Sequence, residues 1–444
     1  MKKVFLFFTC LMASFVSGQS YLSLYNFNHI NQNLLVNPAS PHNYRFVIGI
    51  PGIGGTSAHF NSNSFTKDWL EKGEDPNAKL EETIRNLKKG DRLNSSTSVD
   101  GLFVGFGTKR GYWTVAAQQI NEFNMTIPTE LMKLLYFGNV GSGYVGNTMN
   151  MDNFNVEANV RNEYSIGYQH YIDSNFIVGG RYKYISGVAN TYMDRFNVAL
   201  TTDIDKWTAQ TDIMLNTSGI AGIEDIDPNS FVSEGLFSRN SGMGFDLGAY
   251  YRINDRFDVS VSALNLGWIK WRKDLRGYRS QGSFEFEGTE VNYPGDDFEA
   301  GMENLLDSLG EAFSFEEVGI NSYTTPLPSH FIVSGQFYLT EKHVFGVAYQ
   351  GSVWNKRLYD NIGIMYNGRY SKWINIMVGY QKIDGSFNNL ALGLSLRLGA
   401  FQIYALTDNT FGIMEPTQVA ATNIRAGITL SFYDKPKILK NDKE

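Results

Sequence analysis

Apolar and polar residues alternate with a period of two along most of the chain. Between Asn423 and Phe432 the even positions carry Ile, Ala, Ile, Leu and Phe, while the odd positions carry Asn, Arg, Gly, Thr and Ser. Residues 390–398 have leucine at every even position, and similar alternation recurs at 154–168, 176–184 and 245–252. Because side chains of a strand point alternately to its two faces, each run predicts a strand with one apolar and one polar face.

The lengths of the runs and of their connections favour strands that cross a membrane. Each run reaches the roughly 9–11 residues that a tilted strand needs to span a bilayer, and no apolar run beyond residue 20 approaches the roughly 20 residues of a spanning helix. Strands in hydrocarbon must close into a barrel, because an open edge would leave backbone groups unpaired. Short turns at one end and long loops at the other are typical of outer-membrane barrels. The short turns are 108–111, 173–175, 254–256 and 340–342, and the long connections are 217–240 and 289–326.

The pattern therefore predicts an all-β fold, a transmembrane antiparallel β-barrel with short helical inserts in its loops. The alternative is a soluble β-sandwich or propeller, whose strands also alternate. The strongly apolar face opposite a face of Gly, Ser, Asn and charge favours the barrel. Strands marked by their turns number about sixteen, within two. In residues 257–268 the alternation slips between Ala263 and Leu264, which predicts a β-bulge.

Composition agrees with a barrel and excludes other classes. Mean hydropathy is −0.25, too polar for a bundle of membrane helices, but alternating strands average their two faces to such a value. Aromatic residues make up 14% of the chain, as expected where Tyr and Phe form girdles at both bilayer interfaces. With 38 basic against 45 acidic residues, the chain has no basic footprint for nucleic acid.

The N-terminal residues 1–18 read as a secretory signal peptide, with Lys2 and Lys3 before an apolar stretch and small residues before the expected cleavage site. Cys10 lies within it and is the single cysteine of the chain, so the mature protein is expected to have no disulfide and no thiolate ligand. Residues 433–444 form a short charged tail, expected in the periplasm. We expect the protein in the outer membrane.

The last predicted strand carries a pattern like the C-terminal signal of bacterial outer-membrane barrels. Its members are a polar residue, a glycine and two spaced hydrophobic residues: Arg425, Gly427, Leu430 and Phe432. The expected partners are outer-membrane lipid and, during biogenesis, the barrel-assembly machinery.

The polar faces of the predicted strands supply candidate lumen residues of both signs. Mixed signs predict a hydrated, salt-bridged interior and not a strongly selective ion filter. These candidates are Glu157, Arg161, Glu163, Arg181, Lys183, Asp246, Arg252, Asp258, Arg397 and Arg425.

Three stretches break the strand pattern and predict helices. Residues 66–92 place Leu80, Ile84 and Leu87 at helical spacing, with Gly90 as a stop. Residues 128–137 begin with proline, which suits a first helical turn, and 296–313 carry an apolar stripe. These helices are expected to cap or plug one end of the barrel. The alternative is that they gate a ligand path or form a surface for a partner.

Residues 19–43 precede the expected barrel, which covers 44–432. This segment contains Asn37-Pro38-Ala39 and several other asparagines. It is expected either to plug the lumen or to lie at the periplasmic mouth.

Catalytic and metal-binding signals are absent from the sequence. The six histidines show no HExxH spacing, and no GxSxG elbow occurs. Glu224, Asp225 and Asp227 lack EF-hand spacing and are better explained as a solvated loop than as a calcium site. We expect no enzyme activity, no cofactor and no metal.

Four segments resemble a family of outer-membrane proteins of unknown function from Bacteroidota. They are QNLLVNPAS, GFGTKRGYWTVAAQ, IPTELMKLLYFGN and EYSIGYQHYIDSNFIVGGRYKYISG. That family is similar to the long-chain fatty acid transporter (FadL-like) barrels in its NPA-type N-terminal segment. The resemblance implies an N-terminal plug and fourteen strands, a number that we adopt within a range of 12 to 18.

The resemblance also implies a function, the binding or passage of small hydrophobic molecules across the outer membrane. The alternative is a non-transporting subunit of an outer-membrane secretion, assembly or surface-lipoprotein complex. No substrate residue of the transporters matches a motif of this chain.

Overall fold

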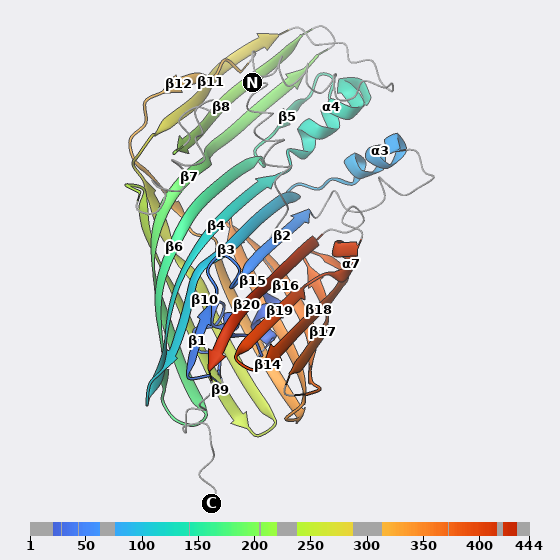
Figure 1. Cartoon of the computed structure of the whole chain (residues 1–444). Helices are drawn as coiled ribbons and strands as arrows, with labels where there is room; N and C mark the ends of the chain where they lie inside the picture. The colour runs from blue at the N-terminus through green and yellow to red at the C-terminus, as the bar shows by residue number, and fades with distance from the viewer. Residues whose placement is uncertain are drawn as a thin grey trace, which may run out of the picture.

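In a computed structural model of the chain, antiparallel strands close into a barrel (Figure 1). The structure describes residues 21–27, 29–42, 44–62, 76–141, 143–203, 206–219, 238–286, 313–371, 373–414 and 421–432. The wall has fourteen strands, which confirms the predicted fold class. The first wall strand is made of two pieces, β1 (Phe46–Gly49) and β2 (Thr56–Ser62), and both pair with β20 (Ala421–Phe432) to close the ring. The strands between them, in ring order, are β3 (Arg92–Gly107), β4 (Gly111–Thr126), β6 (Asn155–Tyr171), β7 (Phe176–Thr202), β9 (Ser241–Asn254), β10 (Phe257–Trp271), β14 (Ser329–Thr340), β15 (His343–Trp354), β16 (Arg357–Arg369), β17 (Ile374–Ile383), β18 (Ser386–Leu398) and β19 (Phe401–Thr407).

The count of strands from the turns, sixteen within two, has the observed fourteen at its lower limit, because some strands lie outside the ring. β7 has 27 residues and runs beyond the rim; its first part pairs with β9 and its last part with β8 (Trp207–Ser218). β8 in turn pairs with β11 (Arg276–Phe286), so that one side of the barrel rises as an extended sheet (Figure 1). Three short strands complete these additions: β5 (Thr148–Asn150), β12 (Glu316–Val318) and β13 (Tyr323–Pro326).

The alternation of the sequence corresponds to the two faces of the wall. On β9, Phe245 and Leu247 are 42% and 55% exposed, whereas Asp246 between them is fully buried. Large apolar side chains exposed on the outside and polar ones buried inside are what a barrel in hydrocarbon requires. The predicted bulge is also present, because the pairing of β10 with β9 shifts register between Ala263 and Leu266.

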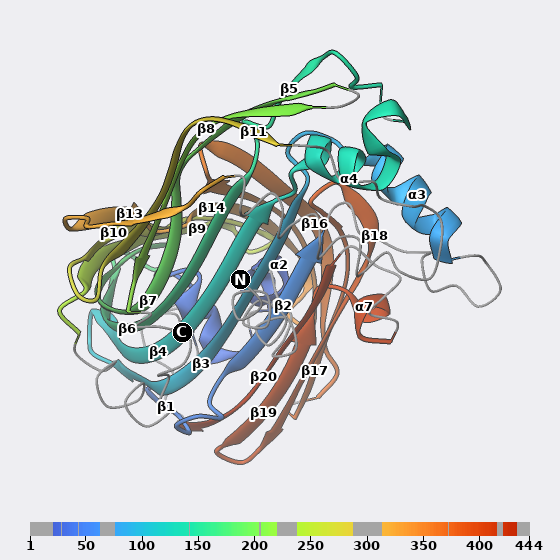
Figure 2. The same cartoon turned by 90° about the horizontal axis from the view of Figure 1, so that it is seen from above.

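Two of the three predicted helices are present. α3 (Pro76–Asn86) and α4 (Thr129–Gly141) lie together at the end of the barrel that bears the long loops, here called the loop side (Figures 1 and 2). The third, 296–313, is outside the described residues except for Phe313, as are the calcium candidates, the signal peptide and the charged tail. The sequence did not predict α7 (Thr410–Met414), a short helix beside β18 and β20. Within the described ranges, no helix is long and apolar enough to cross a membrane.

Candidate functional site

The described residues before the first strand lie inside the ring of strands. Residues 21–42, here called the N-terminal segment, form α2 (Leu22–Asn26) and the 3-10 helix η1 (Asn31–Leu35), and Figure 2 shows α2 surrounded by the wall. Leu22 and Phe27 are fully buried, in an apolar cluster with Ile332, Met365 and other wall residues. The segment therefore occupies the lumen, where each of its polar groups needs a partner.

Wall side chains supply those partners from many strands. The Ser262 hydroxyl donates to the Val36 carbonyl at 2.9 Å, and the Gln169 amide donates to the Ser40 carbonyl at 2.9 Å. The Gln350 side-chain oxygen accepts from the Tyr21 N–H at 2.8 Å. Because these bonds come from β6, β10 and β15, they hold the segment from several sides of the barrel.

The Asn37-Pro38-Ala39 turn packs directly on the backbone of the wall. Gly179 of β7 and Gly248 of β9 are paired across the two strands, and a Cβ on Gly179 would collide with the Pro38 carbonyl. A Cβ on Gly248 would collide with the Asn37 side-chain oxygen and lie 3.0 Å from the Ala39 nitrogen. We call this glycine pair the turn seat, because the close approach of the two backbones requires that both positions lack a side chain.

The N-terminal segment carries no Lys, Arg, Asp or Glu. Burial lowers the pKa of His42 to about 3, and burial, with the charge of Arg369, lowers the pKa of His29 to about 4. Both imidazoles are therefore neutral at physiological pH. An uncharged segment can be buried in the lumen without an ion-pair partner of its own.

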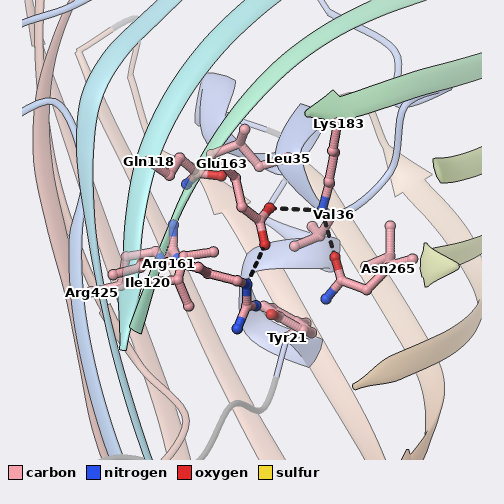
Figure 3. A pocket seen from close by; sticks show the side chains of 12 residues that line it. Tyr21, Leu35, Val36, Gln118, Ile120, Arg161, Glu163, Lys183, Asn265 and Arg425 are labelled. Atoms are coloured by element: carbon pink, nitrogen blue, oxygen red, sulfur yellow. Dashed lines mark hydrogen bonds and ion pairs between the residues drawn. The ribbon is translucent and has the colours of Figure 1, made fainter. Parts of the chain in front are cut away.

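The wall, in contrast, carries a chain of buried charges across the four neighbouring strands β4, β6, β7 and β9. Figure 3 shows its central members Arg161, Glu163 and Lys183. Arg161 donates to Glu122 at 2.5 and 3.1 Å and to Glu163 at 2.8 Å. Lys183 bridges Glu163 and Asp246 at 3.2 and 3.1 Å. We call these residues, with Arg181, the charge ladder.

The charge ladder ends on the N-terminal segment. Arg181 binds Asp246 at 2.9 Å, and the same guanidinium donates to the carbonyls of Leu34 and Leu35. The ladder thus pairs three cations with three carboxylates and is neutral. Each charge of the ladder is already paired with an opposite charge of the ladder. The ladder is therefore better suited to link neighbouring strands than to select an ion.

Two cavities lie among the described residues of the lumen, and both are small. One cavity of about 40 Å³ is lined by Tyr21, Gln118, Arg425 and ladder residues, and a second of about 50 Å³ lies between Arg92, His330 and Trp354. Such volumes hold a few water molecules. They are far below the roughly 300–1,000 Å³ of a pocket for a drug-sized ligand.

On the loop side, the structure contains an apolar cluster, here called the mouth cluster, whose members Phe123 and Val156 lie on the face of β4 and β6 opposite to the lumen-facing Glu122 and Glu157. It is built where α4 and β5 pack against the upper parts of β6, β7 and β8, and it includes Met149, Met193 and Trp207. Its other buried members are Phe123, Leu134, Met151, Val156, Val198, Leu200, Ala209 and Ile213. Methionine is flexible and polarisable, so it fits irregular apolar shapes.

The structure brings five of the proposed lumen residues together and separates the others. Arg161, Glu163, Arg181, Lys183 and Asp246 belong to the charge ladder. The others take separate partners: Glu157 accepts from the Trp354 indole at 2.8 Å, Asp258 accepts from Tyr250 and Tyr338, Arg397 donates to Ser431 and stacks over Tyr44, and Arg252 is half-buried.

The residues of the proposed C-terminal signal lie on β20. Arg425 and Gly427 point inward and are buried, and Arg425 donates to Ser57 at 3.2 Å. Leu430 and Phe432 lie on the outer face, and Phe432 packs against Phe46 of β1. Their role in barrel assembly stays a prediction.

Sequence reasoning missed Glu122, Asn265 and the turn seat. Glu122 lies on the inward face of β4, with Gln118 and Asn124, and the alternation of residues 111–126 could have found it. Asn265 sits in the bulge with a φ of 58°, where its side chain binds Lys183. In the part of the chain that the structure describes, no three His, Asp or Glu residues gather as a metal site.

A model of one protein family matches residues 38–408, most of the chain. The chain belongs to this family of unknown function, DUF5723. This confirms the part of the resemblance that concerned such a family, while a Bacteroidota source stays a prediction. No curated protein matches the chain.

Solved structures of similar shape are outer-membrane barrels. The Ralstonia pickettii toluene transporter TbuX is 9% identical, with a TM-score of 0.43 over 92% of this chain and 95% of that one. The Pseudomonas putida toluene transporter TodX is 8% identical, with 0.42 over 94% and 97%. A Pseudomonas aeruginosa FadL homologue is 9% identical, with 0.41 over 89% and 93%. Similarity at this level carries no argument about what this chain binds.

Proposed function

We propose that the protein is an outer-membrane barrel that binds small hydrophobic molecules at its loop side and passes them toward the lumen. The observation that carries this proposal is the mouth cluster, a methionine-containing apolar cluster at the loop side of the barrel. The apolar outer face of the wall and the short turns at the opposite end support a location in the outer membrane.

The mouth cluster suits uncharged or weakly polar ligands. Its members are apolar, and burying apolar ligand surface against them is worth about 25 cal/mol per Å². Met149, Met151 and Met193 can change rotamer to admit a guest where the side chains are now packed together.

Passage beyond the mouth cluster requires the N-terminal segment to move. The two cavities described are too small for a hydrocarbon of toluene size or larger, so neither offers a path past the seated segment. Because the segment is uncharged, its movement would not break an ion pair between the segment and the wall.

Trp207 gives a direct test of binding in the mouth cluster. We expect bromobenzene, a heavy-atom quencher of toluene size, to quench the tryptophan fluorescence of the purified protein in a saturable way. Trp207→Phe is expected to remove most of the saturable part, because Trp207 packs within the cluster. Non-brominated toluene should compete with the quencher.

Trp373→Phe is the matched control, because Trp373 is 66% exposed and lies on the short turn between β16 and β17. Its loss should leave the saturable quenching intact. Absence of saturable quenching in the wild-type protein would contradict the proposal, and quenching that survives Trp207→Phe would place binding elsewhere.

A second candidate function is supported by the closed lumen itself. A barrel held shut by the charge ladder and by many wall hydrogen bonds also suits a non-transporting subunit of an outer-membrane complex. The sheet of β7, β8 and β11, which rises beyond the ring, would then be a surface for another outer-membrane protein.

Gentle extraction separates the two functions. If the second holds, the protein extracted from its native membrane in a mild detergent should migrate with a partner and show no saturable ligand binding. A protein that migrates alone in every mild detergent would contradict the second function.

A further inference from the structure

One wall strand ends before its neighbours do. β19 has seven residues and pairs with β18 only from Leu392 to Leu398. On its other side it pairs with β20 only from Arg425 to Leu430. Toward the loop side, β18 and β20 continue without a strand between them, where backbone groups need other partners.

Residues 407–414, here called the wall insert, fill that gap. Beyond Thr407, the last residue of β19, they are fixed to the two strands by side chains and not by a strand ladder. The Thr410 hydroxyl donates to the Leu390 carbonyl of β18 at 2.9 Å, and the Thr422 hydroxyl of β20 donates to the Gly412 carbonyl at 3.0 Å. Asn409 bridges the two strands, donating to Asn389 at 3.0 Å and to the Ala421 carbonyl at 2.9 Å.

The two sides of the wall insert face different surroundings. On the outside, Phe411 and Ile413 are each 43% exposed and Met414 is 74% exposed. On the inside, Asp408 and Asn409 are buried. The insert is therefore in contact with both the lumen and the outer surface of the barrel.

Asp408 connects the wall insert to the N-terminal segment. Its carboxylate accepts from the Ser23 backbone N–H, in the first turn of α2, at 3.2 Å. Gln381 of β17 donates both to Asp408 at 3.0 Å and to the Ser23 hydroxyl at 2.8 Å. Asn423 of β20 binds the second carboxylate oxygen.

Among the described residues, Asp408 has amide and backbone donors but no salt bridge to a cation. Loss of one hydrogen-bond donor from a buried carboxylate costs free energy. The folded position of the insert is therefore most stable while the Ser23 N–H binds Asp408. A segment held by side chains also opens more readily than one held in a ladder.

We propose that the wall insert reports the position of the N-terminal segment to the outer surface of the barrel. When the segment is seated, Asp408 holds residues 407–414 in the wall. When it leaves, the insert loosens, and Phe411, Ile413 and Met414 change their packing on the outside. By thermodynamic reciprocity, loosening the insert must also loosen the segment.

The test disturbs the N-terminal segment far from the wall insert and measures exchange at the insert. Gly179→Val blocks the turn seat on β7, across the barrel from α7 (Figure 2). We expect amide hydrogen exchange of residues 407–414 in the full chain to accelerate about 5- to 150-fold, the usual range for two coupled sites. Asp408→Asn should accelerate exchange of residues 21–27 by a similar factor.

Two matched variants control for general loosening. Gly180→Val adds the same side chain at the next position, where the nearest atoms are 3.9 Å from the new Cβ, and should change neither region. Asp360→Asn removes a carboxylate that is 46% exposed and paired with Lys382, and should leave residues 21–27 protected.

The proposal is overturned if Gly179→Val accelerates exchange of residues 36–40 while residues 407–414 keep the wild-type rate. Should Gly179→Val fail to give the heat-resistant folded form on a gel, Asn37→Ala replaces it. That variant removes the bonds of Asn37 to Tyr25 and to the Ala39 N–H without adding bulk. Faster exchange of residues 407–414 in this variant supports the proposal, and faster exchange of residues 36–40 with residues 407–414 at the wild-type rate overturns it.

Discussion

Gly248→Val is expected to convert a closed barrel into one that conducts ions. A valine at this position would overlap the Asn37 side chain, which is itself fixed by a 2.9 Å bond to the Ala39 N–H. Overpacking of this kind costs about 1–3 kcal/mol. Such a cost raises the unseated fraction of the N-terminal segment by about 5-fold to 140-fold, since each 1.4 kcal/mol is a factor of ten. Planar-bilayer recordings should show resolved current steps where the wild-type protein shows none.

The matched control is Gly335→Val, on the outward face of β14. The nearest atom to a Cβ there is 3.9 Å away, an ordinary van der Waals contact, so the added Cβ collides with nothing. This variant should remain as closed as the wild type. If both variants stay closed while the Gly248→Val barrel is folded, the turn seat does not hold the lumen shut.

The second large effect is expected at Arg161. This fully buried guanidinium binds Glu122 and Glu163, and Arg161→Met would leave Glu122 without its cation. Removing one partner of a buried ion pair costs about 3–5 kcal/mol, because the remaining charge stays buried. Urea unfolding in detergent micelles, followed by tryptophan fluorescence, should show a clearly lower midpoint.

Arg195→Met is the control for this loss. Arg195 is 49% exposed and pairs with Asp212 at 3.3 Å on the extended part of the barrel. An exposed pair is worth about 0–1 kcal/mol, so the midpoint should barely move. Equal midpoints for the two variants would show that the charge ladder contributes no more than a surface pair.

The period-two pattern of the sequence predicted the barrel wall well, since each strand obeys a local rule. Phe245, Asp246 and Leu247 are assigned to their faces by alternation alone, and the slip after Ala263 marks a real bulge. The strand count from the turns was about sixteen, within two, against the observed fourteen, because turns do not distinguish a ring strand from β8 or β11, which pair in a sheet outside the ring.

The candidate site was predictable as a set of inward polar residues but not as a connected network. The alternation of each strand places Arg161, Glu163 and Lys183 on the inward face. Their pairing with Glu122 and Asp246 depends on the register between strands. The register between strands is fixed when the whole barrel closes, so it cannot be predicted from the sequence of any one strand.

The interior of the lumen was the least predictable part. Gly179 and Gly248 look like ordinary strand glycines until Asn37 and Pro38 are placed against them. Likewise, Asp408 reads as part of a polar turn, and its contact with Ser23 joins residues 385 positions apart. Such long-range contacts leave no local pattern in the sequence.

The central claim is that the N-terminal segment closes the barrel from inside, and cysteine labelling at Asn26 tests it most directly. Asn26 is fully buried against Ser334 and Asn367, and the mature chain is expected to have no cysteine of its own. In native outer membranes, Asn26→Cys should resist a polar maleimide until the protein is denatured, whereas Glu82→Cys on exposed α3 should react at once. Reaction of Asn26→Cys in the folded barrel as fast as Glu82→Cys would contradict the account.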